Sequence, residues 1–428
     1  MKTNGFPLDI DSLQQPCICG QSHALSTKEI ILEKEALERL PFLLGGSDYP
    51  YRTPVVICDT NTWRVAGDRV CRLLAHCPSI CLQADHLHAD ENAVETVLSS
   101  LPADADILLA VGAGTIHDIT RYVSFQKGIP FFSIPTAASV DGFVSTVAAM
   151  TWHGFKKSFS AAAPICVLAD STVFSQAPGR LTASGISDLF GKYTAIADWK
   201  IAHAITGETI CAKVCQMELE AVEQVQKDLA GIHAGKEESC ERLMYGLLLS
   251  GLAMQMVGSS RPASGAEHHL SHFWEMEILN PCLDAYHGEK VSVGLVYTLG
   301  VYQKAVQKLR TGAFLIPDYS GINRETIHRY FGPKGMEEEI LQENQADPLL
   351  AISRERIEES LQEILTILEE LPAAQEIRDL LHAAGCMVCP EDIGLPDQIM
   401  DLSGKLSPYV RKRLTMMRLL HRFQFVHD

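Results

Sequence analysis

The sequence predicts an α/β N-terminal domain with a parallel, Rossmann-like sheet, followed by an all-α C-terminal domain. Short apolar runs alternate with helical stretches over about the first 175 residues, and most of these runs are continuously apolar. Long helical patterns without comparable strands fill the remainder. Continuous apolar strands separated by helices are typical of a parallel sheet covered on both faces. We therefore expect one domain over residues 1–175 and a second over residues 176–428.

Five apolar runs are the expected strands, and a helical segment follows the first of them. The strands are expected at residues 55–59, 79–83, 107–111, 131–134 and 165–170. The second half shows helical spacing of apolar residues instead. Its clearest helices are expected at residues 184–205, 211–230, 241–256 and 354–371.

Composition excludes several kinds of partner. The 428 residues are 46% hydrophobic and 21% charged, with a formal net charge of -17 and no basic block. This balance argues against nucleic acid and anionic membranes, although a pocket for a small anion needs only a few cations. No apolar run is long enough for a membrane span. The first residues are polar, and the 13 cysteines are dispersed, so we expect reduced thiols in the cytoplasm.

A glycine-containing turn follows the third expected strand, at residues 112–118. Glycine there lets backbone N–H groups approach a pyrophosphate, and the helix N-terminus favours the negative charge. An ordinary strand-to-helix turn with two glycines is the alternative. Small residues from Thr136 to Gly142 follow the next strand, and they would let a cofactor or substrate lie close to the backbone. Here the alternative is a simple turn with hydroxyl caps.

Asp59 ends the first expected strand. A carboxylate at that place can accept hydrogen bonds from ribose hydroxyls and would repel the 2′-phosphate of NADP. The alternative role is an N-cap for the helix that follows.

A histidine-rich segment follows Ser264. Ser264 and Glu267 form an S-x-x-E capping box, which predicts that a helix starts here. His268 and His272 are then four residues apart on one helical face, whereas His269 points elsewhere. Two imidazoles on one face suit a divalent metal, or one ligand and one proton relay. Histidines exposed on the surface are the alternative.

Two further residues could join this site. His287 lies a short distance downstream, after the break at Asn280 and Pro281. Asp188 lies within an otherwise apolar helical stretch, where a buried carboxylate needs a partner such as a cation. A salt bridge from Asp188 to Lys192 is the alternative.

Five motifs in this order resemble those of the glycerol-1-phosphate dehydrogenases. This family stands beside the glycerol dehydrogenases, iron-type alcohol dehydrogenases and dehydroquinate synthases, and the resemblance runs from about Val55 to the C-terminal helices. The motifs are GAGTIHD at 112–118, PTAASVDG at 135–142, GISDLFGK at 185–192, SGAEHHLSH at 264–272 and HGEKVSVG at 287–294. The resemblance implies a dehydroquinate synthase-like fold with a nucleotide-binding first domain and a metal- and substrate-binding second domain.

Site residues follow from the resemblance position by position. The implied metal ligands are Asp188, His268 and His287; the implied substrate contacts are Asp141, Asp188 and His272, of which His272 and Asp141 are the catalytic residues. The implied NAD contacts are Asp59, Gly112, Ala113, Gly114, Thr115, Ile116, Thr136, Ala137, Ala138, Ser139 and Ser145. Iron-type alcohol dehydrogenases usually carry a histidine ligand where this chain has Lys192, so a three-ligand site is expected.

The resemblance implies a cytoplasmic oxidoreductase of phospholipid biosynthesis, most simply a homodimer. It would reduce dihydroxyacetone phosphate reversibly to sn-glycerol 1-phosphate with NAD, or alternatively with NADP, and with one zinc, nickel or iron ion that acts as a Lewis acid. The alternatives are a polyol dehydrogenase acting on unphosphorylated glycerol, a sugar-phosphate cyclase, and a non-catalytic nucleotide-binding scaffold. A cationic pocket for the substrate phosphate would distinguish the expected enzyme from a polyol dehydrogenase. Lys156, Lys157 and Arg261 are the candidates for the cations of this pocket.

Cys17, Cys19 and His23 lie outside the five motifs. Thiolates and imidazole are zinc ligands, but three candidate ligands are fewer than the four of a usual structural site. Their role is left open by the sequence.

Overall fold

The computed structural model describes residues 8–426, which belong to two compact units. The first unit comprises residues up to 189 together with 216–260, and the second comprises 190–215 together with residues from 261 onward. The boundary predicted near residue 175 separates two domains that each fold on their own. This boundary stays a prediction. The first seven residues, part of the polar start discussed above, lie outside the described residues.

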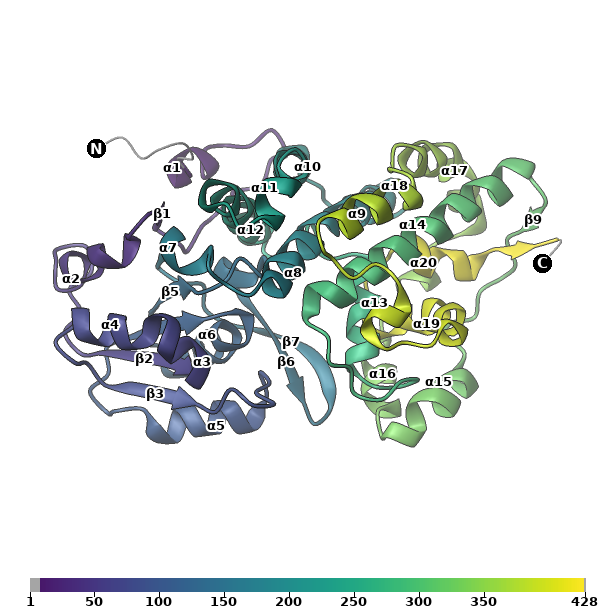
Figure 1. Cartoon of the computed structure of the whole chain (residues 1–428). Coiled ribbons are helices and arrows are strands. Elements are labelled where there is room, and N and C mark those ends of the chain that lie inside the picture. The colour runs from purple at the N-terminus through teal and green to yellow at the C-terminus, as the bar shows by residue number, and fades with distance from the viewer. Residues whose placement is uncertain (1–7, 427–428) are drawn as a thin grey trace. The chain divides into compact units, whose positions relative to one another are not determined.

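A six-stranded parallel sheet forms the centre of the first unit (Figure 1). Its order is β1-β8-β5-β4-β2-β3, and every neighbouring pair is parallel. The strands are β1 (Glu29–Glu33), β2 (Pro54–Asp59), β3 (Ser79–Leu82), β4 (Ile107–Gly112), β5 (Phe131–Pro135) and β8 (Cys166–Asp170). The five predicted strands are confirmed to within a residue or two. The edge strand β1 was not predicted, because only Ile31 at its centre is fully buried.

Helices cover both faces of this sheet, as the continuous apolar strands predicted. Val56 and Leu109 pack into one core with Val70 of α4 (Asp68–Leu73), whereas Ile57 and Leu108 pack into another with Val97 of α5 (Glu91–Ser100). Figure 1 accordingly shows α4 and α5 on opposite sides of β2 and β3. The other helices of this unit are α1 (Ile10–Leu13), α2 (Leu40–Leu43), α3 (Thr60–Thr62), α6 (Gly114–Lys127), α7 (Ser171–Phe174), α11 (Leu229–His233) and α12 (Glu237–Val257), and most of α8 (Gly179–Phe190) and α10 (Ala212–Gln226).

An antiparallel hairpin, which the sequence did not predict, joins β6 (Val147–Trp152) to β7 (Phe155–Ser160). Its two-residue turn holds His153 at φ 51° and Gly154 at φ 76°. Positive φ at both central positions is the requirement of the tight turns that match the twist of paired strands. The hairpin contains only weak alternation of apolar and polar residues, which explains why it was missed.

The second unit is helical, apart from the short strands β9 (Phe314–Leu315) and β10 (Gln424–Phe425). Its helices are α9 (Lys192–Thr206), α13 (Ala266–Glu275), α14 (His287–Thr311), α15 (Arg324–Phe331), α16 (Glu337–Glu343), α17 (Arg354–Glu369), α18 (Ala374–Ala383), α19 (Met400–Leu406) and α20 (Met416–Leu419). A buried apolar core joins α9, α14, α17 and α20. Within the described residues, no helix combines the length and apolarity needed to cross a membrane.

Two of the predicted long helices are wrong in extent. The helix expected over residues 184–205 is interrupted at Gly191, between α8 and α9, and the one expected over residues 211–230 is interrupted after Gln226. The helices expected over residues 241–256 and 354–371 are confirmed as α12 and α17.

Candidate active site

Three predicted cofactor segments begin where three neighbouring strands end. Asp59 is the last residue of β2, Gly112 is the last residue of β4, and Thr136 directly follows β5. The sheet has its topological switch point between β2 and β4, because β3 lies on one side of β2 and β4 on the other. Open α/β sheets bind ligands outside the carboxyl ends of the strands at such a point. The structure therefore brings these segments to the edge where a dinucleotide is expected.

Close packing against the first turn of α6 requires glycine at the end of β4. A Cβ atom on Gly112 would lie 2.6 Å from the Cβ of Ile116. Ala113 is the N-cap residue of α6 and gives no side-chain cap. The first N–H groups of a helix have no intrahelical acceptor, so this terminus offers donors for an anion.

Asp59 caps the helix that follows it. Its Oδ1 accepts hydrogen bonds from the backbone N–H of Asn61 at 2.8 Å and of Thr62 at 2.9 Å. The N-cap interpretation of Asp59 is thereby confirmed. A contact with the cofactor ribose stays a prediction, since a carboxylate has further acceptor sites.

The segment after β5 is buried and packs on α8. The backbone N–H of Thr136 donates to the Gly112 carbonyl at 3.0 Å, and the Ser184 hydroxyl donates to the Ser139 carbonyl at 3.1 Å. A Cβ on Gly185 would lie 2.0 Å from the Ala138 carbonyl oxygen, so only glycine allows this close approach. The small residues of the segment after β5 and of α8 thus allow the two backbones to pack closely.

Ser145 lies at the end of a short 3-10 helix (Gly142–Val144) in the first unit. Its carbonyl accepts a hydrogen bond from the buried Arg121 at 2.8 Å, and its hydroxyl contacts the Val147 carbonyl at 3.2 Å. These contacts hold the loop that follows Asp141. The predicted NAD contact of Ser145 stays a prediction.

Asp141 and Asp188 lie together in the first unit. The Asp141 backbone N–H donates to Oδ2 of Asp188 at 2.9 Å, and the Ser250 hydroxyl donates to Oδ2 of Asp141 at 3.0 Å. Asp188 is 1% exposed and Asp141 8%. The loop after β5 therefore orients the carboxylate that the resemblance assigns to the metal.

Three histidines converge in the second unit, from α13 and the first residue of α14. The ring centroid of His287 lies 5.2 Å from that of His268 and 5.9 Å from that of His272. The rings of His268 and His272 are 6.2 Å apart. The two α13 histidines therefore share a face, as the spacing predicted.

Glu267 fixes the orientation of His268. One of its carboxylate oxygens lies 2.7 Å from Nδ1 of His268 and also accepts the Gly265 N–H at 2.6 Å. These bonds lower the pKa of Glu267 despite its complete burial, which acts in the opposite direction. With Nδ1–H donated to a carboxylate, the lone pair of Nε2 is available to a metal.

The predicted capping box at the start of α13 is wrong. Gly265, not Ser264, is the N-cap residue, and the first N–H of the helix, that of Ala266, donates to Oδ2 of Asp198 at 2.9 Å. A Cβ on Gly265 would lie 2.8 Å from Cα of Ala195 and 2.7 Å from Oδ2 of Asp198. The helix start packs so closely on α9 that glycine takes the position.

His272 differs from His268 in its surroundings. It is 7% exposed, and its Nδ1 has no hydrogen-bond partner among the described residues. Burial, with a contribution from Arg411, holds the pKa of His272 well below its usual value. A neutral imidazole of this kind can accept or donate a proton.

Glu275 was missed in the sequence. Its Oε1 lies 3.3 Å from Nδ1 of His287 and 3.3 Å from Nζ of Lys290. Ligand atoms of His272, Glu275 and His287 all lie within 4.8 Å of one another. The spacing of residues 268, 272 and 275 is the i, i+4, i+7 pattern of one helical face, which would have revealed Glu275.

The predicted phosphate cations differ in availability. Arg261 makes a two-point ion pair with Glu208, at 2.8 and 3.0 Å, so its charge is already matched. Lys156 and Lys157 lie on β7 in the first unit. In the second unit, Arg411 acts electrostatically on both His272 and Glu275, and burial lowers its own pKa. Arg411 was not singled out in the sequence.

Comparisons with known proteins show the family of the chain. Residues 31–178 match the family of iron-containing alcohol dehydrogenases. The chain is 36% identical to the glycerol-1-phosphate dehydrogenase [NAD(P)+] of Geobacillus thermodenitrificans, over 96% of this chain and 97% of that protein. It is 35% identical to the protein of the same name from Geobacillus stearothermophilus, over 98% of each chain.

Solved structures support the same fold. Glycerol dehydrogenase from Schizosaccharomyces pombe superimposes with a TM-score of 0.55 at 17% identity, over 93% of this chain and 96% of that chain. Such low identity carries the fold alone, whereas the identity to the two Geobacillus proteins extends over nearly the whole chain. The chain therefore belongs to the glycerol-1-phosphate dehydrogenase family, among the iron-containing alcohol dehydrogenases.

Proposed function

We propose that the chain reduces dihydroxyacetone phosphate reversibly to sn-glycerol 1-phosphate, with NADH or NADPH as the reductant and one divalent metal ion. The names of the two Geobacillus relatives describe this NAD(P)-dependent reaction. The observation that carries the proposal is the convergence of His268, His272 and His287 in the second unit. The first unit of the same chain has a parallel sheet whose strand order is typical of dinucleotide binding at the carboxyl ends of the strands.

Asp188, His268 and His287 are the proposed metal ligands. A carboxylate and two imidazoles suit zinc, nickel or iron, and the Glu267 carboxylate at Nδ1 of His268 is the supporting contact that ligand histidines usually have. When bound, the metal supplies Lewis-acid polarisation of the substrate carbonyl. Because Lys192 donates to the Ala263 carbonyl, it holds backbone rather than taking a fourth ligand position.

His272 is the proposed proton donor for reduction. Its low pKa favours a neutral ring at pH 7, which can pass on a proton that it receives from solvent. Asp141 is the proposed partner that orients the substrate, because its backbone N–H and carboxylate tie it to Asp188 and Ser250.

NAD contacts are proposed along the three strand ends, namely at Asp59, residues 112–116, residues 136–139 and Ser145. When bound, the cofactor would supply the hydride, and the residues at these strand ends would hold it. We predict that Asp59 favours NADH and that Asp59→Gly narrows the preference over NADPH. Gly at an N-cap costs only a few tenths of a kcal/mol, so kinetics can be compared directly.

Asp90→Gly is the matched control for this prediction. Asp90 caps α5 through the Ala93 N–H as Asp59 caps α3, but it does not end a strand of the sheet. Its removal should leave the ratio of kcat/KM for the two cofactors unchanged. An unchanged ratio in Asp59→Gly would remove Asp59 from cofactor discrimination.

Arg411 is the cation proposed to hold the substrate phosphate, given its effect on His272. The decisive experiment measures NADH oxidation with dihydroxyacetone phosphate and with dihydroxyacetone, and identifies the product enantiomer. The phosphorylated substrate should be strongly preferred and give sn-glycerol 1-phosphate. Arg411→Leu should raise KM for dihydroxyacetone phosphate while changing dihydroxyacetone turnover little. A preference for the unphosphorylated substrate would favour a polyol dehydrogenase instead.

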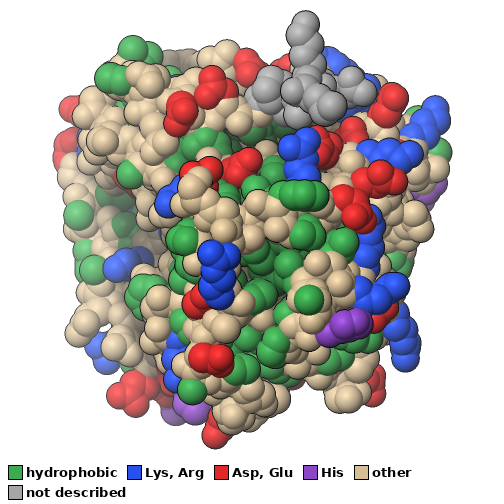
Figure 2. Space-filling model, turned by 90° about the vertical axis from the view of Figure 1, so that its left-hand side faces the viewer, with side chains coloured by type: hydrophobic (Ala, Val, Ile, Leu, Met, Phe, Trp, Pro, Cys, Tyr) green, Lys and Arg blue, Asp and Glu red, His purple; other side chains and the backbone are tan. Residues whose placement is uncertain are grey.

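A cytoplasmic homodimer is also proposed. Figure 2 looks onto the first unit and shows apolar side chains gathered among charged ones. Large apolar side chains of this unit are exposed, including Phe42 at 85% and Val65 at 54%. Exposed apolar surface of this kind marks association sites. Light scattering of the purified protein should give twice the mass of one chain.

A further inference from the structure

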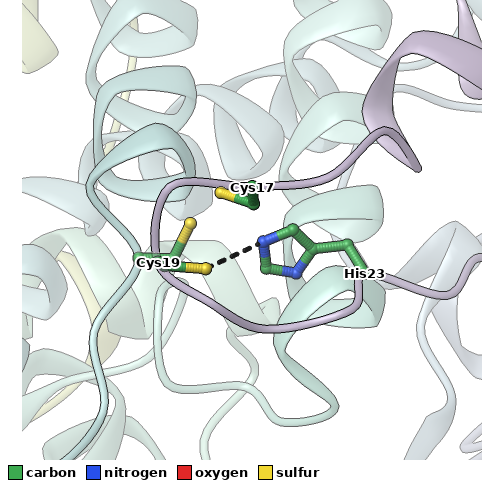
Figure 3. A group of neighbouring side chains, drawn as sticks. Cys17, Cys19 and His23 are labelled. Carbon is green, nitrogen blue, oxygen red and sulfur yellow. Dashed lines mark hydrogen bonds between the residues drawn. The ribbon is translucent and has the colours of Figure 1, made fainter.

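A second group of metal-type side chains lies in the first unit, in the segment between α1 and β1. Cys17, Cys19 and His23 come from a stretch without helix or strand, and Figure 3 shows the three side chains drawn toward one another. None of them belongs to the five motifs or to the strand edge described above. The proposed reaction leaves this group without a role.

A tight turn brings the three residues together. The Gly20 N–H donates to the Cys17 carbonyl at 3.0 Å, and Gly20 adopts φ 76°. That conformation is unfavourable for residues with a Cβ, so glycine allows the chain to reverse directly after Cys19. The reversal returns the chain to His23 beside both thiols.

The distances among the side chains match a shared ion. The sulfur of Cys19 lies 3.4 Å from Nε2 of His23, the contact marked in Figure 3. Ligand atoms of Cys17, Cys19 and His23 all lie within 4.8 Å of one another. Tetrahedral zinc, with Zn–S near 2.3 Å and Zn–N near 2.05 Å, separates sulfur from nitrogen by about 3.6 Å. The observed separation is close to that value.

The orientation of His23 is a second, independent observation. His23 is 2% exposed, and its Nδ1 lies 2.6 Å from the carbonyl of Met256 in the last turn of α12. A helix leaves its last carbonyls without intrahelical donors, so Nδ1 is the nitrogen that carries hydrogen. Nε2 then presents its lone pair to Cys19. A backbone carbonyl at the other ring nitrogen is the usual support of a histidine metal ligand.

We propose that Cys17, Cys19 and His23 bind a structural zinc ion, separate from the proposed catalytic metal. Two thiolates and an imidazole are zinc ligands, and both thiols must lose their protons on binding. The ion would fasten the segment before β1 to the end of α12. Gln255, the neighbour of Met256, already contacts the same segment through the Ser26 N–H at 2.8 Å and the Thr27 hydroxyl at 2.9 Å. A four-coordinate zinc site needs one further ligand beyond these three.

Metal analysis of the full-length protein tests the proposal. Wild-type protein loaded with zinc should hold about two equivalents per chain, and Cys19→Ser or His23→Ala should each lose about one. His287→Ala should lose the other equivalent, so failure of the catalytic-metal proposal and failure of this one are distinguishable. Cys81→Ser and His86→Ala, which replace exposed residues of the same unit, are the matched controls and should keep both equivalents. Unchanged zinc content in both Cys19→Ser and His23→Ala would overturn the proposal.

A measurement on the wild-type protein avoids dependence on variants that fail to fold. Cobalt substituted for zinc should show thiolate-to-cobalt charge-transfer absorption, because the proposed catalytic ligands contain no sulfur. Its intensity counts the thiolates and so reports whether the fourth ligand is another cysteine. Absence of this absorption in cobalt-loaded protein with fully reduced thiols would refute the site. A Cys17–Cys19 disulfide in protein prepared under reducing conditions would refute it as well.

Discussion

His268, His269 and His272 occupy two turns of one helix, and their surroundings give them different chemistry. His268 has its Nδ1 held by Glu267, as a metal ligand needs. Neither ring nitrogen of His269 has a hydrogen-bond partner within residues 8–426, and burial together with the positive charge of Arg413 lowers its pKa. His272 stands beside Glu275 and His287, and ligand atoms of the three residues lie within 4.8 Å of one another. The histidine side chain is thus suited to a different role at each position: metal ligand at His268, core residue at His269 and proton transfer at His272.

At the scale of single residues, the first prediction concerns His272. If it moves a proton without binding the metal, His272→Ala should retain the metal and lose rate on the order of 100- to 10,000-fold. Metal analysis and steady-state kinetics on the same preparation measure both quantities. Loss of the metal in His272→Ala, with retention in His268→Ala, would exchange the roles of the two residues.

His269, the third histidine of the same helix, is unsuitable as the control for that experiment. The sequence places it off the face shared by His268 and His272, but it is 1% exposed within the core of the second unit. His269→Ala would leave a cavity, and such cavities destabilise proteins. The exposed His382 in α18 is the suitable control, and His382→Ala should change neither metal content nor rate.

His117 allows a pH prediction. It is completely buried beside β5, where its Nε2 contacts the Ser133 hydroxyl at 2.8 Å, and burial lowers its pKa to about 3. Because the unfolded chain binds this proton near pH 6.5, the contribution of His117 to stability falls as the pH drops below that value. Between pH 7 and pH 5 the loss should be about 2 kcal/mol.

Urea unfolding at pH 7 and pH 5 measures this loss. His117→Gln removes the titrating group, so its free energy of unfolding should change less between the two pH values than that of wild type. His86→Gln replaces an exposed histidine and should keep the wild-type difference. Equal pH dependence in His117→Gln and wild type would contradict the prediction.

At the scale of elements, burial on both faces determined what could be read from sequence. β4 is buried at all six positions, so its continuous apolar run identified it at once. β7 is fully buried only at Phe155 and carries two lysines, and its pairing with β6 depends on the turn at His153 and Gly154. The division into α8 and α9 was equally hidden, because the residues on both sides of Gly191 have helical character. The hairpin and the division between α8 and α9 were therefore missed because their signal lies in a turn.

The candidate site could be predicted only in part, for a related reason. His268 and His272 were singled out because residue type and helical spacing mark metal chemistry, and His287 because it is a histidine a short distance downstream. Glu267 and Arg411 were missed in their present roles, since orienting a ligand or setting a local charge leaves no spacing pattern. Glu267 was predicted to be one half of a capping box with Ser264. Its carboxylate instead accepts a hydrogen bond from the Gly265 N–H and contacts Nδ1 of His268.

A prediction for α13 concerns Glu267, which orients His268. Its carboxylate joins the start of α13 to Thr194 of α9 and to His268. Glu267→Gln keeps the size of the side chain but removes the charge that supports the imidazole. Loss of such a supporting contact typically costs 10- to 100-fold in metal affinity or activity, so about that loss is expected here.

Metal titration of Glu267→Gln against wild type measures the effect. Glu289→Gln is the matched control, because Glu289 is another buried glutamate that accepts a backbone N–H at the start of a helix, that of Tyr286 at 2.7 Å. It should alter metal affinity little. Equal losses in both variants would indicate general destabilisation instead of a role in orienting His268.

At the scale of the whole molecule, the chain divides its chemistry between two units. The first unit contains the strand edge, Asp141 and Asp188, and the second contains the histidines, Glu275 and Arg411. The chain passes between the units more than once, because residues 190–215 belong to the second and 216–260 to the first. The proposed metal ligands are contributed by both units, so a full ligand set requires the whole chain.

The last prediction follows from that requirement. Asp188→Asn, His268→Ala and His287→Ala should each lower metal content and abolish turnover, although the substitutions fall in different units. A metal that binds only the folded protein stabilises it by about 2.7 kcal/mol when its free concentration is 100 times Kd. Added zinc or nickel should therefore raise the melting temperature of metal-stripped wild type, and the rise should shrink in each of the three variants, whose circular dichroism should remain that of wild type. His382→Ala should respond to metal as wild type does. Full metal content and normal turnover in any one of the three variants would remove that residue from the ligand set, and if Asp188→Asn were the exception, the histidines of the second unit would hold the metal with Glu275.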